Sequence, residues 1–434
     1  MKNAPLCGMA ILTMSCTLMS IVHAADSDEV AQLQKQLAET RQSLERLTER
    51  VRELEAVISA AQAEPSAVAA PAAPSPSASN ERLTSVERDV AEITAASAAH
   101  HDEPGLPLHG FADVSVGTRN PINPDLKHAA VGSLDFYLTP PLGPRTSALF
   151  ELNFKVGTSG DATFDIERAQ FGYQFSDAAT LWLGRFHTPY GYYNTAFHHG
   201  AQMTSALRRP LVVQFEKTGG VMPAHTVGLW LAGDDRVGTG RLTYDVYVGN
   251  AQRIVGGTLD VRNGGNANGD LMVGGNLGFL AEEFLGGFKV GASVFTAEIG
   301  DDLLPSNLTR VKNYGLYVVH DTERWENIAE FYAFDNEDLS GGSGTHSSDM
   351  GFVQLAYRAG QWTPYARYER SDFDQTDRYF TALRYGGSYS REALGARFDL
   401  DLTSALKFEL AQTRFTDRAV REYSEAVMQY AIRF

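Results

Sequence analysis

The chain has 434 residues, a formal net charge of -16 at pH 7 and a hydrophobic content of 43%. Its mean hydropathy of -0.23, together with the lack of an internal apolar run of about 18 residues, excludes a helical membrane protein. The acidic balance argues against a nucleic-acid partner. Abundant Gly, Tyr and Phe indicate instead one large β-rich unit with many turns.

Residues 1–24 are predicted to be a secretory signal peptide. A largely apolar stretch follows Lys2, and the expected cleavage site lies after Ala24. Both cysteines of the chain, Cys7 and Cys16, fall within this segment. The mature chain is therefore expected to have no disulfide framework and no thiolate chemistry.

Residues 25–63 are predicted to form an α-helical coiled coil, because apolar residues recur with a sustained seven-residue period. Arg and Glu flank these positions at 50–55 and again at 82–87. This pattern favours a coiled coil of three chains, with a coiled coil of two chains as the alternative. The heptad a positions are Val30, Leu37, Leu44, Val51 and Ile58.

Two further segments separate this helix from the rest of the chain. Residues 64–79 are mostly Pro, Ala and Ser, a composition typical of an extended linker. Residues 80–99 repeat the heptad step over a shorter stretch, and residues 100–107 form a helix-breaking connector.

From residue 108 to residue 434 the hydrophobic period changes to two. Phe150, Leu152 and Phe154, for example, alternate with polar residues. This pattern predicts an all-β unit, a transmembrane antiparallel β-barrel of about 16 strands in each chain. The expected strands are 109–117, 130–139, 146–156, 164–175, 179–186, 225–232, 241–249, 271–280, 287–297, 311–320, 325–335, 348–358, 361–371, 389–400, 404–414 and 422–434.

The last predicted strand ends the chain on an aromatic residue. Phe434 and Tyr430 share one face with other apolar residues, while Gln429 and Glu425 share the opposite face. This arrangement is typical of the strand that closes an outer-membrane barrel. Paired acids such as Asp234-Asp235 and Glu337-Asp338 are expected in the loops and turns between strands.

The longest connection runs from His187 to Ala224, after the fifth predicted strand. Strand parity, the terminal Phe434 and the alternation of long and short connections resemble the general Gram-negative porins, over residues 108–434. In that family a loop at this place folds into the channel and narrows it. The turn Gly184-Arg185-Phe186-His187-Thr188-Pro189-Tyr190-Gly191 is similar to one in phosphate-selective and related anion porins.

The resemblance implies that this long loop carries the pore constriction. Separately, the aromatic residues of the loop are a candidate track for a sugar or another planar solute, with packing of the loop on the barrel wall as the alternative. The residues of the constriction are expected to be His187, Tyr190, Tyr193, Arg208, Arg209, Glu216 and Lys217. Alternation separately places basic residues on the inner, lumen-facing side of the wall, interspersed with acids. These are Lys155, Arg168, Arg241, Arg367 and Arg397.

The sequence therefore predicts a passive diffusion channel for small hydrophilic solutes, with a modest anion preference and without a cofactor. A channel specific for a sugar or an organic acid, and a barrel-anchored periplasmic tether, are the alternatives. A hydrolase built on Ser205 with His198 and His199 is less favoured, because neighbours on a loop do not establish a catalytic geometry. The histidines near the loop do not have the spacing of a zinc site, so no metal is expected.

The expected location is the bacterial outer membrane, with the N-terminal coiled coil in the periplasm. The expected partners are two further copies of the chain in a homotrimer, outer-membrane lipid and lipopolysaccharide, and the barrel assembly machinery. Peptidoglycan or a periplasmic protein is a candidate partner for the coiled coil.

Overall fold

The computed structural model describes residues 108–118, 128–156, 162–176, 178–197, 200–260, 270–302, 308–416 and 422–434. The predicted signal peptide, both coiled-coil segments, the linker and the connector lie outside these residues. No helix of the described part is long and apolar enough to cross a membrane.

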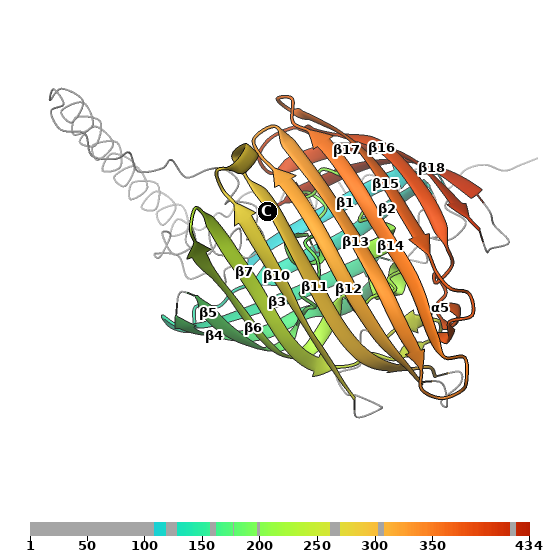
Figure 1. The fold of residues 1–434 in the computed structure, drawn as a ribbon. Coiled ribbons are helices and arrows are strands. Elements are labelled where there is room, and N and C mark those ends of the chain that lie inside the picture. The colour runs from blue at the N-terminus through green and yellow to red at the C-terminus, as the bar shows by residue number, and fades with distance from the viewer. Residues whose placement is uncertain are drawn as a thin grey trace, which may run out of the picture. The chain divides into compact units, whose positions relative to one another are not determined.

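In the described part, sixteen strands form one closed antiparallel barrel (Figure 1). Each strand pairs with its neighbour along the chain, and the last strand pairs with the first. The wall strands are β1 (Leu108–Gly117), β2 (His128–Leu138), β3 (Thr146–Val156), β4 (Ala162–Ser176), β5 (Ala179–His187), β6 (His225–Val237), β7 (Gly240–Asn250), β10 (Leu271–Ala281), β11 (Phe288–Gly300), β12 (Leu308–Asp321), β13 (Trp325–Asp338), β14 (Thr345–Tyr357), β15 (Trp362–Asp372), β16 (Tyr389–Asp399), β17 (Ser404–Phe415) and β18 (Glu422–Arg433).

The predicted all-β barrel is thus confirmed, and each predicted strand is present. The terminal residue closes the sheet, because Phe434 N–H donates to the carbonyl of Gly110 at 2.9 Å and Gly110 N–H donates back at 2.8 Å. Closure leaves the barrel without unpaired edge strands, which is the condition for a sheet in a bilayer.

Two strands are longer than predicted and include pairs of acids that were expected in loops or turns. β6 continues to Val237, five residues beyond its predicted end, so Asp234 and Asp235 lie in a strand rather than in a turn. Glu337 and Asp338 likewise belong to β13. The extension is possible because Gly238 adopts a φ of +63°, a left-handed conformation that closes the hairpin to β7 in two residues.

The two faces of the wall differ in exposure as alternation requires. In β15, Tyr368 is 48% exposed on the outer face, whereas its neighbours Arg367 and Glu369 are 3% and 0% exposed on the inner face. The outer face carries aromatic pairs at the ends joined by short turns, such as Trp325 with Tyr357 at 4.8 Å between ring centroids. Charged pairs lie on the outer face near the other ends of the strands: Arg310 with Glu298, Arg370 with Asp372 and Arg414 with Glu392.

Several inner tyrosines lie across glycines of neighbouring strands. A Cβ atom added at Gly291 would overlap the Tyr317 ring, and one added at Gly315 would overlap the ring of Tyr332. These side chains therefore follow the wall rather than project from it. The glycines leave room for the chain segments that enter the barrel.

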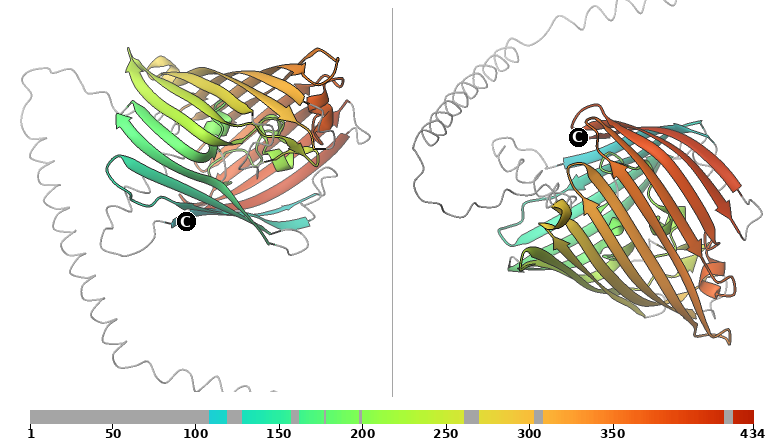
Figure 2. Two further views of the ribbon diagram at one scale, coloured as in Figure 1. Left: turned by 90° about the horizontal axis from the view of Figure 1, so that it is seen from below. Right: turned by 45° about the horizontal axis from the view of Figure 1, so that its top comes forward.

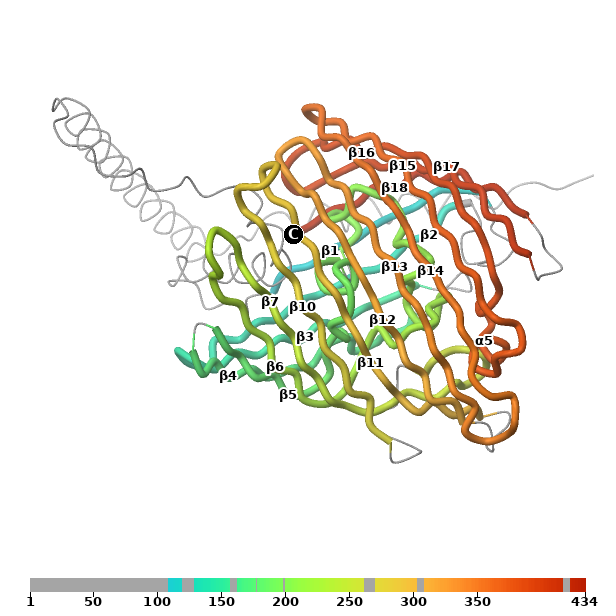
Figure 3. The backbone as a smooth tube through the Cα atoms, viewed as in Figure 1, coloured from blue at the N-terminus to red at the C-terminus, as the bar shows by residue number. Residues whose placement is uncertain are grey.

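Four connections of the described part carry short elements of their own. Residues 188–224, here called the inner loop, contain α4 (Tyr193–Ala196), η1 (Leu211–Val213) and η2 (Glu216–Thr218). The β7–β10 connection contains the hairpin β8 (Ile254–Val255) with β9 (Thr258–Leu259), and the β15–β16 connection contains α5 (Arg378–Ala382). The β10–β11 turn contains η3 (Phe284–Gly286). The green chain of the inner loop lies within the ring of strands (Figures 2 and 3).

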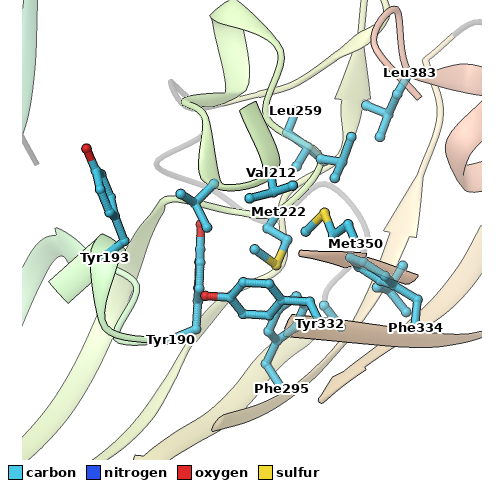
Figure 4. Packing of buried hydrophobic residues seen from close by; sticks show 14 of the residues in the cluster. Tyr190, Tyr193, Val212, Met222, Leu259, Phe295, Tyr332, Phe334, Met350 and Leu383 are labelled. Atoms are coloured by element: carbon cyan, nitrogen blue, oxygen red, sulfur yellow. The ribbon is translucent and has the colours of Figure 1, made fainter. Parts of the chain in front are cut away.

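The main hydrophobic core lies inside the barrel, where these connections meet the wall. Tyr190, Val212 and Met222 of the inner loop pack with Tyr332 and Phe295 of the wall (Figure 4). Each of these side chains is at most 1% exposed. The inner loop is thus a packed part of the fold.

Candidate channel and its inner loop

The inner loop leaves and rejoins the wall at one place. His187 ends β5 and is the register partner of His225, which begins β6. Above this pair, Thr188 N–H donates to the carbonyl of Ala224 at 2.9 Å, and the Asn194 side chain donates to the carbonyl of Thr188 at 2.8 Å. The base of the inner loop is therefore closed, and the loop can be held in one position.

Glu330 of β13 holds the first part of the inner loop. Its carboxylate accepts the backbone N–H groups of Tyr192 and Tyr193 at 2.7 and 2.6 Å, and the hydroxyl of Tyr332 at 2.7 Å. Glu330 is only 3% exposed. A buried carboxylate with several donors is well compensated, so this contact fixes the start of α4 against the wall.

Strand β17, four strands away from β13 around the barrel, holds the middle of the inner loop. Lys407 of β17 is fully buried and donates to the Thr204 hydroxyl at 3.0 Å and to the carbonyl of Ala206 at 3.2 Å. The side-chain amide of Gln202 reaches the carbonyl of Leu402, in the turn between β16 and β17, at 3.4 Å. The inner loop thus extends from the long-loop end of the barrel to a short-turn end.

β15 holds the next part. Arg367 donates to the carbonyl of Arg208 at 2.7 Å, and Glu369 accepts the N–H of Leu211 at 2.5 Å. The two wall residues also pair with each other at 2.9 Å. Many charged side chains of the inner wall are therefore directed at the backbone of the inner loop rather than at open solvent.

A row of alternating charges crosses β16, β17 and β18 beside this segment. Arg391 pairs with Glu425 at 2.7 Å and with Glu409 at 3.2 Å, and Arg208 of the inner loop pairs with Glu425 at 2.9 Å. The Arg208 side chain is 22% exposed, whereas the other three are nearly inaccessible. Arg208 is accordingly the member of this row that is most open to a solute.

The structure separates the two neighbouring arginines that the sequence placed together at the constriction. The Arg209 guanidinium donates to the carbonyls of Phe197, at 2.5 Å, and of Val213, and to the Asn194 side chain. It also lies over the Phe215 ring at 4.4 Å. Arg209 therefore stabilises the inner loop from within, and burial lowers the pKa of its guanidinium.

The structure also gives the neighbouring residues Glu216 and Lys217 different surroundings. Glu216 is 1% exposed and accepts the N–H of His225 at 3.1 Å and a side-chain N–H of Gln252 at 3.2 Å. Burial alone would raise the pKa of Glu216, but His225 and these donors outweigh it and lower the pKa. The ammonium group of Lys217 pairs with Asp165 of β4 at 2.6 Å and remains 39% exposed.

The remaining predicted constriction residues are buried. His187 lies 3.4 Å from Glu151, and Tyr190 packs edge-to-face on Tyr332. Tyr193 lies beneath Arg209, and burial raises the pKa of its hydroxyl to about 12. Of the seven predicted constriction residues, Lys217 keeps an exposed side chain, and Arg208 and Arg209 are partly exposed.

The predicted lumen-facing bases all come from inward positions, but they differ in surroundings. Arg168 pairs with Glu151 at 2.6 Å, and Arg241 pairs with Asp234 at 3.2 Å. Arg397 pairs with Asp399 and donates to the carbonyl of Thr204, while Lys155 is half-buried on β3. At the closing terminus, Tyr430 and Phe434 face outward, 43% and 53% exposed.

Sequence reasoning missed the anchoring role of Glu330 and Lys407 and the charge row around Arg391. Alternation does carry a signal for Arg391, because it has the same parity in its strand as Arg397. Parity gives only the face of the wall, and the loop partner of each residue lies more than 130 positions away in the chain.

The proposed hydrolase residues do not gain a catalytic arrangement in the described part. The Ser205 hydroxyl donates to Glu326 at 2.7 Å, and Glu326 is also held by Arg358 at 2.8 Å. His198 and His199 lie outside the described residues. Among the described side chains, no group of three His, Cys, Asp or Glu residues is placed to hold a metal ion.

No protein-family profile matches the chain, and no curated protein sequence matches it. Solved structures of similar fold include the outer membrane channel DcaP of Acinetobacter baumannii, with 13% identity, a TM-score of 0.48, and coverage of 75% of this chain and 96% of that one. A second is the in-vitro folded OmpT of Vibrio cholerae, an outer membrane protein, with 9% identity, a TM-score of 0.49, and coverage of 75% of this chain and 96% of that one. A third is OmpF of Salmonella typhi in complex with daunomycin, with 13% identity, a TM-score of 0.48, and coverage of 75% of this chain and 97% of that one.

Proposed function

We propose that the chain is an outer-membrane porin, a passive channel for small hydrophilic solutes. The observation that carries this proposal is the closed sixteen-strand wall, apolar on its outer face and charged on its inner face. Barrels of this strand number are wide enough to enclose an aqueous channel. The inner loop reduces that width, so the channel is selective for small solutes.

The outer face supports a place in the outer membrane. Aromatic residues at the short-turn ends match the interfacial girdle of membrane barrels, and the charged pairs near the long-loop ends match a lipopolysaccharide headgroup zone. The short turns then face the periplasm, where the predicted coiled coil of residues 25–63 would extend. We also propose that the barrel assembly machinery reads the strand that ends at Phe434.

The homotrimer is part of the same proposal. On β2, β3 and β4 the outer face carries interlocked aromatic rings, with Phe154 at 5.6 Å from Phe136 and at 5.0 Å from Phe164. Phe434 of the closing strand joins them, 5.9 Å from Phe136. Large flat apolar side chains without outward charges suit a contact between copies of the chain.

A modest anion preference rests on Arg208. External acids are screened within about 8 Å at physiological salt, so they affect capture more than passage. A charge against the low-dielectric wall of a narrow channel acts on each passing ion at short range. Arg208 is partly exposed and makes one ion pair, whereas the Arg209 guanidinium is bonded to carbonyl groups of the inner loop. The net charge of -16 resides largely elsewhere.

The test is the reversal potential of the purified chain in a planar bilayer under a KCl gradient. Wild type is expected to prefer chloride modestly, and Arg208→Glu is expected to shift the potential toward cation preference. The matched control is Arg370→Glu, because Arg370 is 63% exposed on the outer face and should leave the potential unchanged. A cation-selective wild type, or an Arg208→Glu channel identical to it, would refute the anion preference.

A further inference from the structure

A small cavity lies between the inner loop, the β15–β16 connection and the ends of β16, β17 and β18. Its volume is about 60 Å³. Since one water needs about 10–15 Å³ measured in this way, the cavity holds roughly four to six waters, or a solute with a similar number of heavy atoms. Arg208, Val221, Met350, Tyr389, Phe415 and Tyr423 are among its lining residues.

Most of the cavity wall is apolar and aromatic. Phe415 stacks on Tyr423 with 6.1 Å between the ring centroids, and Tyr389 lies 6.0 Å from Phe415. Met350 and Val221 belong to the buried core beside them. An ion that is polar on every side, such as phosphate, would lose hydration against these walls without compensation.

Two polar side chains of the lining have hydrogen-bond donors without a partner in the described structure. Tyr389 is 7% exposed, and its hydroxyl has no hydrogen-bond partner among the described residues. A buried polar group without a partner points to an unseen one. Arg208 offers five N–H donors, and the described structure gives its side chain one ion pair, with Glu425.

The charged residues around the cavity indicate which charge and which hydrogen-bonding groups a ligand should have. Arg391, which also lines it, is already occupied by Glu409 and Glu425. The remaining capacity therefore consists of hydrogen-bond donors, which suit a ligand that brings acceptor oxygens. Arg208, Arg367 and Arg391 are matched by Glu369, Glu409 and Glu425. Arg209 also lines the cavity and is held by carbonyl groups rather than by a carboxylate, so one positive charge of the wall is unmatched and favours a singly charged anion over a multiply charged one.

We propose that this cavity is a binding site for short-chain monocarboxylates of two to four carbons. The carboxylate accepts hydrogen bonds from Arg208 and, once the Tyr389 side chain turns its enclosed hydroxyl toward the cavity, from that hydroxyl. The alkyl chain lies against the aromatic walls. The inference deepens the proposed channel by naming a solute class, and it rests on that function for the route by which the solute arrives. Binding itself does not require conduction, so the two can be tested apart.

The experiment is titration of sodium propionate into the full-length chain in detergent, followed by calorimetry and by ligand-observed NMR. Propionate is expected to bind, acetate and butyrate to compete, and phosphate and hexanoate to fail. Tyr389→Phe removes the hydroxyl oxygen. It is expected to weaken propionate binding about tenfold, because loss of one hydrogen bond to a charged group changes the affinity by about that factor. Arg208→Gln is expected to weaken it by at least as much.

The matched control is Tyr247→Phe, because Tyr247 is another buried tyrosine whose hydroxyl has no partner among the described residues, and it does not line the cavity. It should bind propionate like wild type. Absence of binding by wild type, equal binding by Tyr389→Phe, or competition by phosphate would each overturn the site. A chain that binds propionate but passes no ion current would overturn the channel and leave the site standing.

Discussion

Single side chains of the inner wall decide where the inner loop lies. Glu330 shows this clearly, because one carboxylate satisfies two backbone donors at the start of α4 and a tyrosine hydroxyl. If the carboxylate became an amide, its N–H₂ group would face those donors and leave at least one unpaired. Loss of such a charged hydrogen bond costs about 1.5–3 kcal/mol.

We therefore expect Glu330→Gln to loosen the inner loop while the barrel remains folded. Single-channel recordings should show frequent transitions between two current levels where wild type shows one. Glu298→Gln serves as the control, since Glu298 pairs with Arg310 on the outer face and does not contact the inner loop. Recordings of Glu330→Gln that match wild type would mean that the loop is held without this anchor.

At the scale of elements, the base of the inner loop is held by a group that responds to pH. The pKa of Glu216 is lowered from its ordinary value of 4.5, so the folded loop favours the carboxylate. The resulting stabilisation is present above pH 4.5 and is lost as the pH falls through the lower, folded-state pKa. Acidification should thus release η2 from His225 and Gln252.

The expected outcome is a rise in current fluctuations of the wild-type channel as the pH is lowered below about 4.5. Glu216→Gln should fluctuate already at pH 7 and should change little on acidification. A wild-type channel that is steady down to the lowest pH at which the barrel stays folded would show that Glu216 does not control the loop.

The strands themselves could be predicted from sequence because alternation reports directly on the two environments of a membrane wall. Phe150, Leu152 and Phe154 face outward as predicted, and Glu151 and Asn153 face inward. The partners of the inner loop could not be predicted, since Lys407 and Ala206 meet only when the barrel closes. Arg208 and Arg209 are adjacent in sequence, yet the fold of the inner loop gives them different surroundings.

For the whole molecule, the number of strands in the wall and the filling of the barrel interior have opposite effects on the width of the channel. Sixteen strands enclose a wide space, while the inner loop and the core around Tyr190 occupy part of it. A channel of this construction should pass ions and small solutes at a modest rate. The central claim is that a continuous aqueous path remains past the inner loop.

The most direct test is the current of the purified, folded chain in a planar bilayer in symmetric KCl. The account predicts discrete, stable steps as channels insert, with a current proportional to voltage at low voltage. Each step should be small for a barrel of this strand number, because the inner loop occupies the interior. Insertion of correctly folded barrels without any current step would contradict the proposed channel.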